Sequence, residues 1–220
     1  MTTLTSIAVI GGTGAEGGAL ALRLANAGHR VCIGSRDAAR AQAAADAINT
    51  RLGATRASGA ASRAAAASCP IVLLAVPYAG QQATALDLKA ELEGKILIDA
   101  TVPLVPPQVS RVQLPEGGSA VAKLQALLGP GVKVVAAFQN VSAHLLDDLA
   151  HTVDCDVLVC GDDAAACETV LSLVASIGLR GVHAGPVANA AAAEALTSLL
   201  IAINRRHKVK GSGIRITGIG

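Results

Sequence analysis

SIAVIGGTGAEGG, residues 6–18, joins a short apolar run to a glycine-rich turn. Gly12, Gly14 and Gly17 match the pattern G-x-G-x-x-G directly after that run. In a strand–turn–helix unit the first glycine permits a tight turn, the second lets the backbone approach a pyrophosphate, and the third lets helix and strand pack closely. Free N–H groups at the start of the helix then favour an anion. The stretch therefore predicts a dinucleotide-binding turn; the alternative is a glycine-rich turn with a structural role alone.

The end of the next expected strand indicates which dinucleotide binds. A site for NAD places Asp or Glu about 20 residues after the glycines, where it binds a ribose hydroxyl. Here the run ends in CIGSR, residues 32–36, so that Ser35 and Arg36 replace the carboxylate. A hydroxyl and a guanidinium can bind a 2′-phosphate, and Arg40 lies one helical turn further on. We therefore expect NADP(H); the alternative is a solvated pair of charges at the start of a helix.

Apolar runs alternate with alanine-rich stretches along almost the whole chain. Most of these runs lack polar alternation, which is typical of strands covered on both faces of a parallel sheet. The alternation predicts an α/β fold with a doubly wound, mostly parallel Rossmann-type sheet. The expected strands are 6–10, 30–34, 71–76, 95–99, 133–137, 156–160 and 181–184. The expected helices are 15–27, 38–52, 81–92, 119–128 and 164–177.

The C-terminal part differs in character from the rest of the chain. We expect an NADP-binding domain over residues 1–184 and a short helical segment over residues 185–220, with its helix at 189–206. That helix has a broad apolar stripe, formed by Leu196, Leu199, Leu200 and Ile203. So broad a stripe belongs deep in a core or at a subunit contact, and we expect a homodimer. Residues 101–118 hold four prolines and are expected to form one long loop, a kind of segment that is often functional.

The composition limits the kinds of partner. The 220 residues are 52% hydrophobic and 15% charged with a net charge of +2, which excludes intrinsic disorder and gives no electrostatic case for nucleic acid. One Phe, one Tyr and no Trp leave no aromatic platform for stacked bases. No uninterrupted apolar run approaches the length of a membrane span, and no signal-type segment opens the chain. We therefore expect a cytoplasmic protein with neither a nucleic-acid nor a membrane partner.

The sequence shows no arrangement typical of a catalytic nucleophile or a metal. Motifs such as G-x-S-x-G and H-E-x-x-H are absent, and the five cysteines and five histidines lack metal-ligand spacing. The pair Asp162-Asp163 separates an expected strand from an expected helix, which favours helix capping over acid–base chemistry. Hydride transfer fits this absence, because holding two rings face to face supplies most of the effect. We therefore expect catalysis by positioning only.

Five stretches together make the chain similar to a known family. They are GGTGAEGG, the strand end IGSR with Arg40, the strand exit AVPY, the block DVLVCGDD and the tail AGPVANAAAAEALTSLLIAINRR. Over nearly its whole length the chain resembles the NADPH-dependent reductases of the deazaflavin coenzyme F420. The glycine turn occurs in many Rossmann proteins, whereas VCGDD together with AGP…N…EALT is more specific. The resemblance implies reversible hydride transfer between NADP(H) carbon 4 and deazaflavin carbon 5, without a flavin or a metal.

The resemblance also implies roles for individual residues. It assigns Thr13, Gly14 and Ala15 to the pyrophosphate, and Ser35, Arg36 and Arg40 to the 2′-phosphate. Pro77 and Tyr78 are assigned to the dinucleotide, although packing is the alternative for Tyr78. The stretch FQNV, residues 138–141, matches the family segment beneath the two reacting rings. Gln139, Asn140 and Val141 are accordingly expected in the deazaflavin pocket.

Two positions depart from the family pattern. Gln139 stands where archaeal relatives carry histidine, which keeps hydrogen bonding but loses a titration near neutrality. Ala191 stands where some relatives carry arginine, which removes one contact to the acidic side chain of F420. Arg205 and Arg206 can replace that contact electrostatically, since the coenzyme tail carries phosphate and glutamates. The alternative is that both are favourable charges at the end of a helix.

Two other functions are compatible with these residues. NADP-dependent reductases of imines or carbonyls, such as the pyrroline carboxylate reductases, share the α/β plan. They typically add a larger helical C-terminal domain, whereas only residues 187–220 follow Pro186 here. The second is a protein that senses NADPH without turnover. Such a protein would bind NADPH but would not oxidise it with any acceptor.

Overall fold

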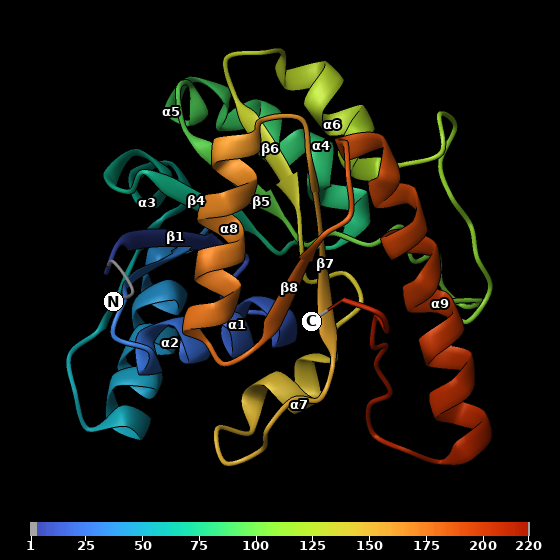
Figure 1. The fold of residues 1–220 in the computed structure, drawn as a ribbon. Coiled ribbons are helices and arrows are strands. Elements are labelled where there is room, and N and C mark those ends of the chain that lie inside the picture. Colours follow the sequence, from blue (N-terminus) through green and yellow to red (C-terminus); the bar gives the residue numbers. More distant parts are fainter. Residues whose placement is uncertain (1–3, 220) are drawn as a thin grey trace.

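The structure, a computed structural model, describes residues 4–219. Residues 1–3 and 220, the outer ends of the two expected ranges 1–184 and 185–220, lie outside the described residues. A single sheet runs through the molecule with helices on both of its faces (Figure 1). The strands are β1 (Ser6–Ile10), β2 (Arg30–Ser35), β3 (Ala57–Ala61), β4 (Ile71–Leu74), β5 (Ile96–Asp99), β6 (Lys133–Ala136), β7 (Asp156–Gly161) and β8 (Arg180–His183).

The order of the strands confirms the predicted fold class. The order is β3-β2-β1-β4-β5-β6-β7-β8, with β1 to β6 all parallel. β7 pairs antiparallel to β6 through only two residue pairs, and β8 then runs parallel to β7. The order reverses between β1 and β4, and a doubly wound sheet binds a dinucleotide across such a reversal. The fold therefore places the glycine turn, which follows β1, at the expected crevice.

Two layers of helices cover the sheet and complete two apolar cores. One core joins the sheet to α1 (Ala15–Asn26), α2 (Ala38–Leu52), α7 (Ala143–Asp147) and α8 (Ala164–Ser176). The other joins it to α3 (Ser62–Ser68), α4 (Tyr78–Asp87), α5 (Lys89–Leu92) and α6 (Ala120–Leu128). In Figure 1, α1, α2 and α7 lie in the lower half and α3, α5 and α6 in the upper half. Alanine-rich helices approach such a sheet closely because they carry little side-chain volume.

Several elements differ from the sequence prediction. β3 was not predicted because its sequence, ASGAA, has small residues where an apolar run is expected. The small residues are needed there, since a Cβ on Gly59 would lie 2.1 Å from the backbone nitrogen of Gln42 in α2. The helix predicted at 81–92 is two helices, because the backbone leaves helical geometry at Leu88, whose side chain is buried. The long loop predicted at 101–118 is confirmed, since no helix or strand lies between β5 and α6.

A buried carboxylate holds the last helix, α9 (Ala190–His207), to the body of the protein. Glu194 accepts hydrogen bonds from Ser119 Oγ at 2.7 Å, from the Ala120 nitrogen at 2.9 Å and from the Val121 nitrogen at 3.1 Å. These groups open α6, whose first N–H groups have no partner within the helix. Nearby, the Val187 nitrogen, in the short helix η1 (Val187–Asn189), donates to Asp162 Oδ1 at 2.9 Å. The N-terminal half of α9 is thus fixed by polar contacts on two sides.

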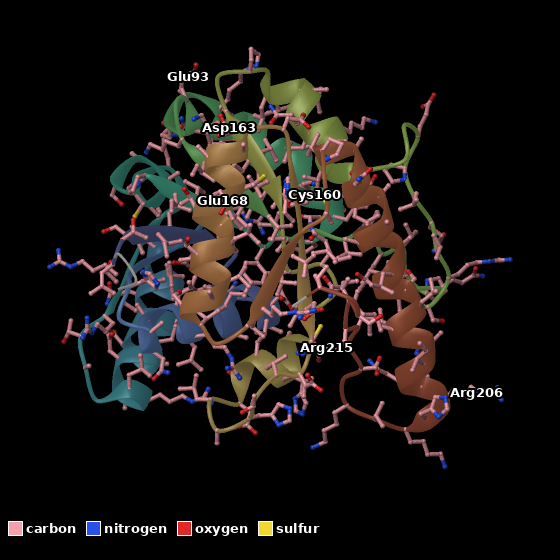
Figure 2. The ribbon with its side chains drawn as sticks, in the orientation of Figure 1. Glu93, Cys160, Asp163, Glu168, Arg206 and Arg215 are labelled. Atoms are coloured by element: carbon pink, nitrogen blue, oxygen red, sulfur yellow. The ribbon has the colours of Figure 1, made fainter. Side chains whose placement is uncertain are left out.

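The chain after α9 returns to the sheet, as Figure 1 shows near the label C. The Asp156 nitrogen donates to the Ile214 oxygen at 2.8 Å, and the Asp156 side chain is fully buried. Arg180 donates to Asp156 through Nε at 2.8 Å and Nη2 at 2.7 Å, and this hydrogen-bonded pair lowers the pKa of Asp156. Arg215, labelled in Figure 2, adds an ion pair with Asp154 at 3.0 Å. The tail is therefore docked on β7 and β8.

The outer side of α9 stays apolar and exposed. Leu199 is 48% exposed and Ile203 is 42% exposed. The segment Val187–His207 is long and apolar enough, by length and composition alone, to cross a membrane. Its most apolar window has a mean hydropathy of 1.4, and 33% of that window is buried inside the protein. Core helices of soluble proteins meet the same criterion, and this one carries the buried Glu194. Its exposed side presents Leu199 and Ile203 to solvent.

We predict that Glu194→Ala destabilises the protein by about 2–4 kcal/mol, because three buried donors at the start of α6 lose their acceptor. Urea unfolding followed by circular dichroism measures the effect. The matched control is Glu168→Ala, since Glu168 is exposed on α8 and remote from α9 (Figure 2). The control is expected to change stability by less than about 0.5 kcal/mol. Equal stabilities of the two variants would contradict the anchoring role of Glu194.

Candidate functional site

The glycine turn brings the start of α1 against the end of β1. A Cβ on Gly17 would lie 2.5 Å from the Gly11 oxygen, and a Cβ on Gly12 would lie 3.0 Å from Ile33 Cγ2. Gly11 has φ +87°, a conformation that side chains disfavour. Gly14 stands at the N-cap of α1, where no side chain caps the helix. The first N–H groups of α1 are therefore free to bind an anion.

One cavity lies on the β2 side of the turn and contains all three residues assigned to the 2′-phosphate. Its volume is about 620 Å³, and Ser35, Arg36 and Arg40 line it together with Thr13 and Gly14. Both arginines are exposed residues at its edge. The structure thus brings together the glycine turn and the cationic strand end that were 20 residues apart in the sequence.

The carboxylate of Asp37 also borders this cavity, but it is hydrogen-bonded to the start of α2. Asp37 stands at the N-cap of α2, and its Oδ1 accepts from the Ala39 nitrogen at 2.9 Å and the Arg40 nitrogen at 3.2 Å. The Asp37 nitrogen in turn donates to Ser35 Oγ at 3.2 Å. Because its oxygen is held by the helix start, Asp37 opposes a bound phosphate less than a free carboxylate would.

A second cavity lies on the other side of the turn, over the ends of β4, β5 and β6. Its volume is about 410 Å³, and it shares Gly14, Ala75, Val76 and Pro77 with the first cavity. Of the residues assigned from the family, Ala15, Tyr78, Gln139 and Val141 line it. Phe138, in the stretch 138–141 that the family resemblance placed beneath the rings, lines it as well. Among the further lining residues, sequence reasoning assigned no role to Glu16, Thr101 or Thr197. One elongated ligand can therefore extend from the first cavity into the second past Gly14.

A buried polar cluster supports the wall of the second cavity. Asp99 is fully buried, and its carboxylate accepts hydrogen bonds from Gln81 Nε2 and, at 2.8 Å, from the Thr101 nitrogen. Burial raises the pKa of Asp99, while the bonds from Thr101 and Gln81 oppose that rise. Gln139 Nε2 donates to the backbone oxygen of Asp99 at 2.6 Å, and Thr197 Oγ1 donates to the backbone oxygen of Gln139 at 2.6 Å. The cluster fixes Gln139 from both sides.

Two atoms of this wall are free to bind a ligand. Gln139 Oε1 and Thr101 Oγ1 are buried and have no hydrogen-bond partner within residues 4–219, and both residues border the cavity. Unpaired buried polar atoms are rare in proteins and costly. At the wall of a cavity, such atoms are available as hydrogen-bond partners of a ligand.

The backbone is strained directly before Gln139. Phe138, the single phenylalanine of the chain, has φ +76°, which only a few per cent of non-glycine residues adopt. Its side chain is buried and lines the second cavity. Such strain is kept where the surroundings force it, and it concentrates at functional sites.

Glu16 is the carboxyl group of the second cavity. It lies in the first turn of α1, and its Oε1 is shielded from solvent without a partner in the described chain, although the residue as a whole keeps some exposure. Burial raises the pKa of Glu16 to about 8. This raised pKa favours the protonated form of Glu16 at neutral pH. No sequence signal points to this role, since Glu16 occupies one of the unspecified x positions of the pattern G-x-G-x-x-G.

Five of the assigned residues line neither cavity: Gly12 and Gly17, which pack the glycine turn, and Asn140, Arg205 and Arg206. The Asn140 side chain is directed to β7, where Nδ2 donates to the Asp156 oxygen at 2.7 Å and Oδ1 accepts from the Leu158 nitrogen at 3.3 Å. Arg205 donates to Ser110 Oγ in the long loop at 3.0 Å. Arg206 lies at the far end of α9 (Figure 2), about 13 Å along the helix from Thr197.

Asp163 and the cysteines have structural rather than catalytic settings. Asp163 caps α8 by accepting from the Ala166 nitrogen at 2.8 Å, which confirms the predicted capping. Four of the five cysteines are buried and none forms a disulfide. Over residues 4–219 no three His, Cys, Asp or Glu side chains come together as metal ligands would.

The sheet order, the uncapped glycine turn and the two adjoining cavities define a dinucleotide-binding protein of the Rossmann class. The family described as NADP oxidoreductase, coenzyme F420-dependent, matches residues 6–103. The chain is 42% identical to the F420-dependent NADP reductase of Methanothermobacter thermautotrophicus over 220 residues, which cover 97% of this chain and 95% of that protein. The chain belongs to the family of F420-dependent NADP reductases.

Solved structures agree with this family. An Arthrobacter sp. FB24 protein assigned as an F420-dependent NADP reductase superposes with a TM-score of 0.81 at 30% identity, covering 97% of this chain and 99% of that one. The pyrroline carboxylate reductase of Plasmodium falciparum, with NADP bound, gives a TM-score of 0.55 at 16% identity and covers 83% of this chain and 59% of that one. This second likeness shows the shared fold alone.

Proposed function

We propose that this chain transfers a hydride reversibly between NADP(H) and the deazaflavin coenzyme F420. In the direction of F420 reduction, NADPH gives a hydride to carbon 5 of the deazaflavin, and a proton from solvent completes F420H2, leaving NADP+. The observation that carries this proposal is the pair of cavities that meet at Gly14, in a chain similar over its whole length to reductases of this kind.

The first cavity suits the adenosine half of NADP(H). The pyrophosphate binds at Thr13, Gly14 and Ala15, where α1 offers uncapped N–H groups. Ser35, Arg36 and Arg40 bind the 2′-phosphate, which the locally bonded Asp37 tolerates. A pyrophosphate at Gly14 directs the nicotinamide past Pro77 into the second cavity.

The second cavity suits the two reacting rings. Tyr78, Phe138 and Val141 supply apolar walls that exclude water, while Thr101 and Gln139 offer unpaired atoms for the ring substituents. No side chain needs to form a covalent bond or accept the hydride. The chain accelerates the reaction by orientation, which is able to lower a barrier by about 7–11 kcal/mol.

The segment 185–220 completes the deazaflavin side in this proposal. Thr197 borders the second cavity, and Glu194 fixes the helix that carries it. Arg205 and Arg206 lie beyond the cavity, where they attract the phosphate and carboxylates of the F420 tail after the ring has bound. Asn140 supports the pocket through its bonds to β7.

The exposed apolar side of α9 supports a homodimer. Val105, Val112 and Leu114 of the long loop are also exposed, and the bond between Arg205 and Ser110 joins that loop to α9. We infer that these loop residues, together with Leu199 and Ile203, are the apolar side chains that a second copy of the chain would cover. In this proposal the protein is cytoplasmic, acts on small molecules, and has neither a membrane nor a nucleic acid as partner.

The reaction is tested by anaerobic mixing of the purified protein with oxidised F420 and NADPH, following deazaflavin absorbance. We expect rapid bleaching with NADPH and little with NADH. Tight NADPH binding without bleaching would overturn the F420 reaction and leave the dinucleotide site standing. Imine and carbonyl acceptors then distinguish a reductase of another substrate from a protein that only senses NADPH.

The phosphate assignment is tested by Arg36→Ala. We expect NADPH binding to weaken by about 1.5–3 kcal/mol, because a charge-assisted bond to the 2′-phosphate is lost, with NADH binding nearly unchanged. Titration calorimetry measures both dissociation constants. The control is Arg30→Ala, an exposed arginine at the opposite end of the same strand, β2. Unchanged NADPH affinity in Arg36→Ala would contradict the assignment.

The dimer is tested by Leu199→Asp, which places a charge in the middle of the apolar surface. Light scattering coupled to size exclusion is expected to give twice the chain mass for the unmodified protein and the single chain mass for the variant. Leu86→Asp, at a leucine that is 45% exposed on α4, is the control and should stay dimeric. A monomeric unmodified protein would refute the proposal.

A further inference from the structure

The Glu16 carboxyl does not contribute a hydrogen bond to the fold. It forms no hydrogen bond within residues 4–219, and its Oε1 is buried against the second cavity. A buried acceptor without a partner costs stability, so a carboxyl group kept in this state points to a ligand. The chain alone does not satisfy this group.

The fold determines which part of a bound dinucleotide lies beside Glu16. The strand order reverses between β1 and β4, and the cationic residues for the 2′-phosphate line the cavity on the β2 side. The nicotinamide half must then extend to the β4 side, because the pyrophosphate is held at Gly14 between the two cavities. Glu16 lines only the cavity on that side, two residues after Gly14.

We propose that the Glu16 carboxyl lies beside the nicotinamide ring and, by gaining or losing its proton, sets the relative affinity of the site for NADP+ and NADPH. The oxidised ring is a cation and the reduced ring is neutral. An ionised Glu16 attracts the oxidised ring, whereas a protonated Glu16 offers only a neutral O–H donor and discriminates little between the two. This inference rests on the NADP(H) site of the proposed function and does not depend on the F420 reaction.

The charged side chains packed around this cavity bond to other groups, which leaves Glu16 as the carboxyl group that titrates in it. Tyr78, at the start of α4, is the other titratable side chain among the described lining residues. Asp99, at the end of β5, does not line the cavity and is bonded to Gln81 and Thr101. Arg23, on the same helix as Glu16, donates to the oxygens of Leu145, Leu146, Asp148 and His151 around α7. Residues 4–219 thus place no cation against Glu16, and burial is what raises its pKa to about 8.

The sign of the pH effect follows from this pKa. Below about pH 8 Glu16 is protonated, and above it the carboxylate forms. A bound pyrophosphate is negative and moves the transition upward, while an oxidised ring moves it downward. The preference for NADP+, expressed as the dissociation constant of NADPH divided by that of NADP+, should therefore rise with pH. The 2′-phosphate titrates in both cofactors, so its contribution largely cancels in the ratio.

The test measures both dissociation constants between about pH 6.5 and about pH 9.5, a range that brackets the titration of Glu16. NADPH fluorescence gives one constant and its displacement by NADP+ gives the other. The proteins are the unmodified chain, Glu16→Gln, and the control Glu168→Gln on the exposed side of α8 (Figure 2). Glutamine keeps the size and the hydrogen-bonding capacity of the protonated acid but cannot ionise.

We expect the ratio to rise on the order of tenfold across this range in the unmodified chain and in the control, and to stay flat in Glu16→Gln. A flat ratio in the unmodified chain, or the same rise in Glu16→Gln, would overturn the role of Glu16. Failure of both cofactors to bind the unmodified chain would overturn the NADP(H) site and this inference with it. A rising ratio in a protein that does not bleach F420 would uphold the inference and reject the reaction.

Discussion

The close approach of α1 to the turn after β1 is the contact on which the site depends. Gly17 is pressed against the Gly11 oxygen so tightly that a single added carbon would collide with it. This contact brings uncapped helical N–H groups to the point where the strand order reverses. Both cavities open from that point, because the backbone of Gly14 is a wall of each. A side chain at Gly17 would move α1, and both cavities would lose their common edge.

The second constraint is the attachment of α9, and it explains the family-specific part of the sequence. In the tail, Glu194 and Thr197 of EALT bond to the start of α6 and to the Gln139 oxygen. In the block VCGDD, Asp162 bonds to the start of η1 and Asp163 caps α8. These residues therefore act by placing a helix against a cavity rather than by chemistry. This agrees with a reaction in which two rings need only be held in place.

The fold was predictable because its signals are local. The glycine turn, the apolar runs and the alanine-rich helices can each be recognised from about a dozen consecutive residues. Strand β3 could not be recognised in this way, because its close packing on α2 requires small residues in place of an apolar run. The assignment of Ser35 and Arg36 to the 2′-phosphate is a prediction of the same local kind, since these residues replace an expected carboxylate at a known spacing. Gln139 was named through family resemblance, but its setting was not: the bond to the Asp99 oxygen spans 40 positions in sequence, and the strained Phe138 has no sequence signature.

The two cavities differ in charge, and this difference follows from what each would hold. The first has arginines at its rim, where a phosphate that is anionic in both redox states of the cofactor would bind and water still reaches it. In the proposed function the second would hold a ring whose charge changes during the reaction, and a permanent charge there would favour one redox state throughout. A carboxyl group whose burial keeps it near the point of ionisation avoids a fixed bias, because its charge is set by the surroundings. The placement of Glu16 beside an uncharged wall is consistent with a site that must release hydride in either direction.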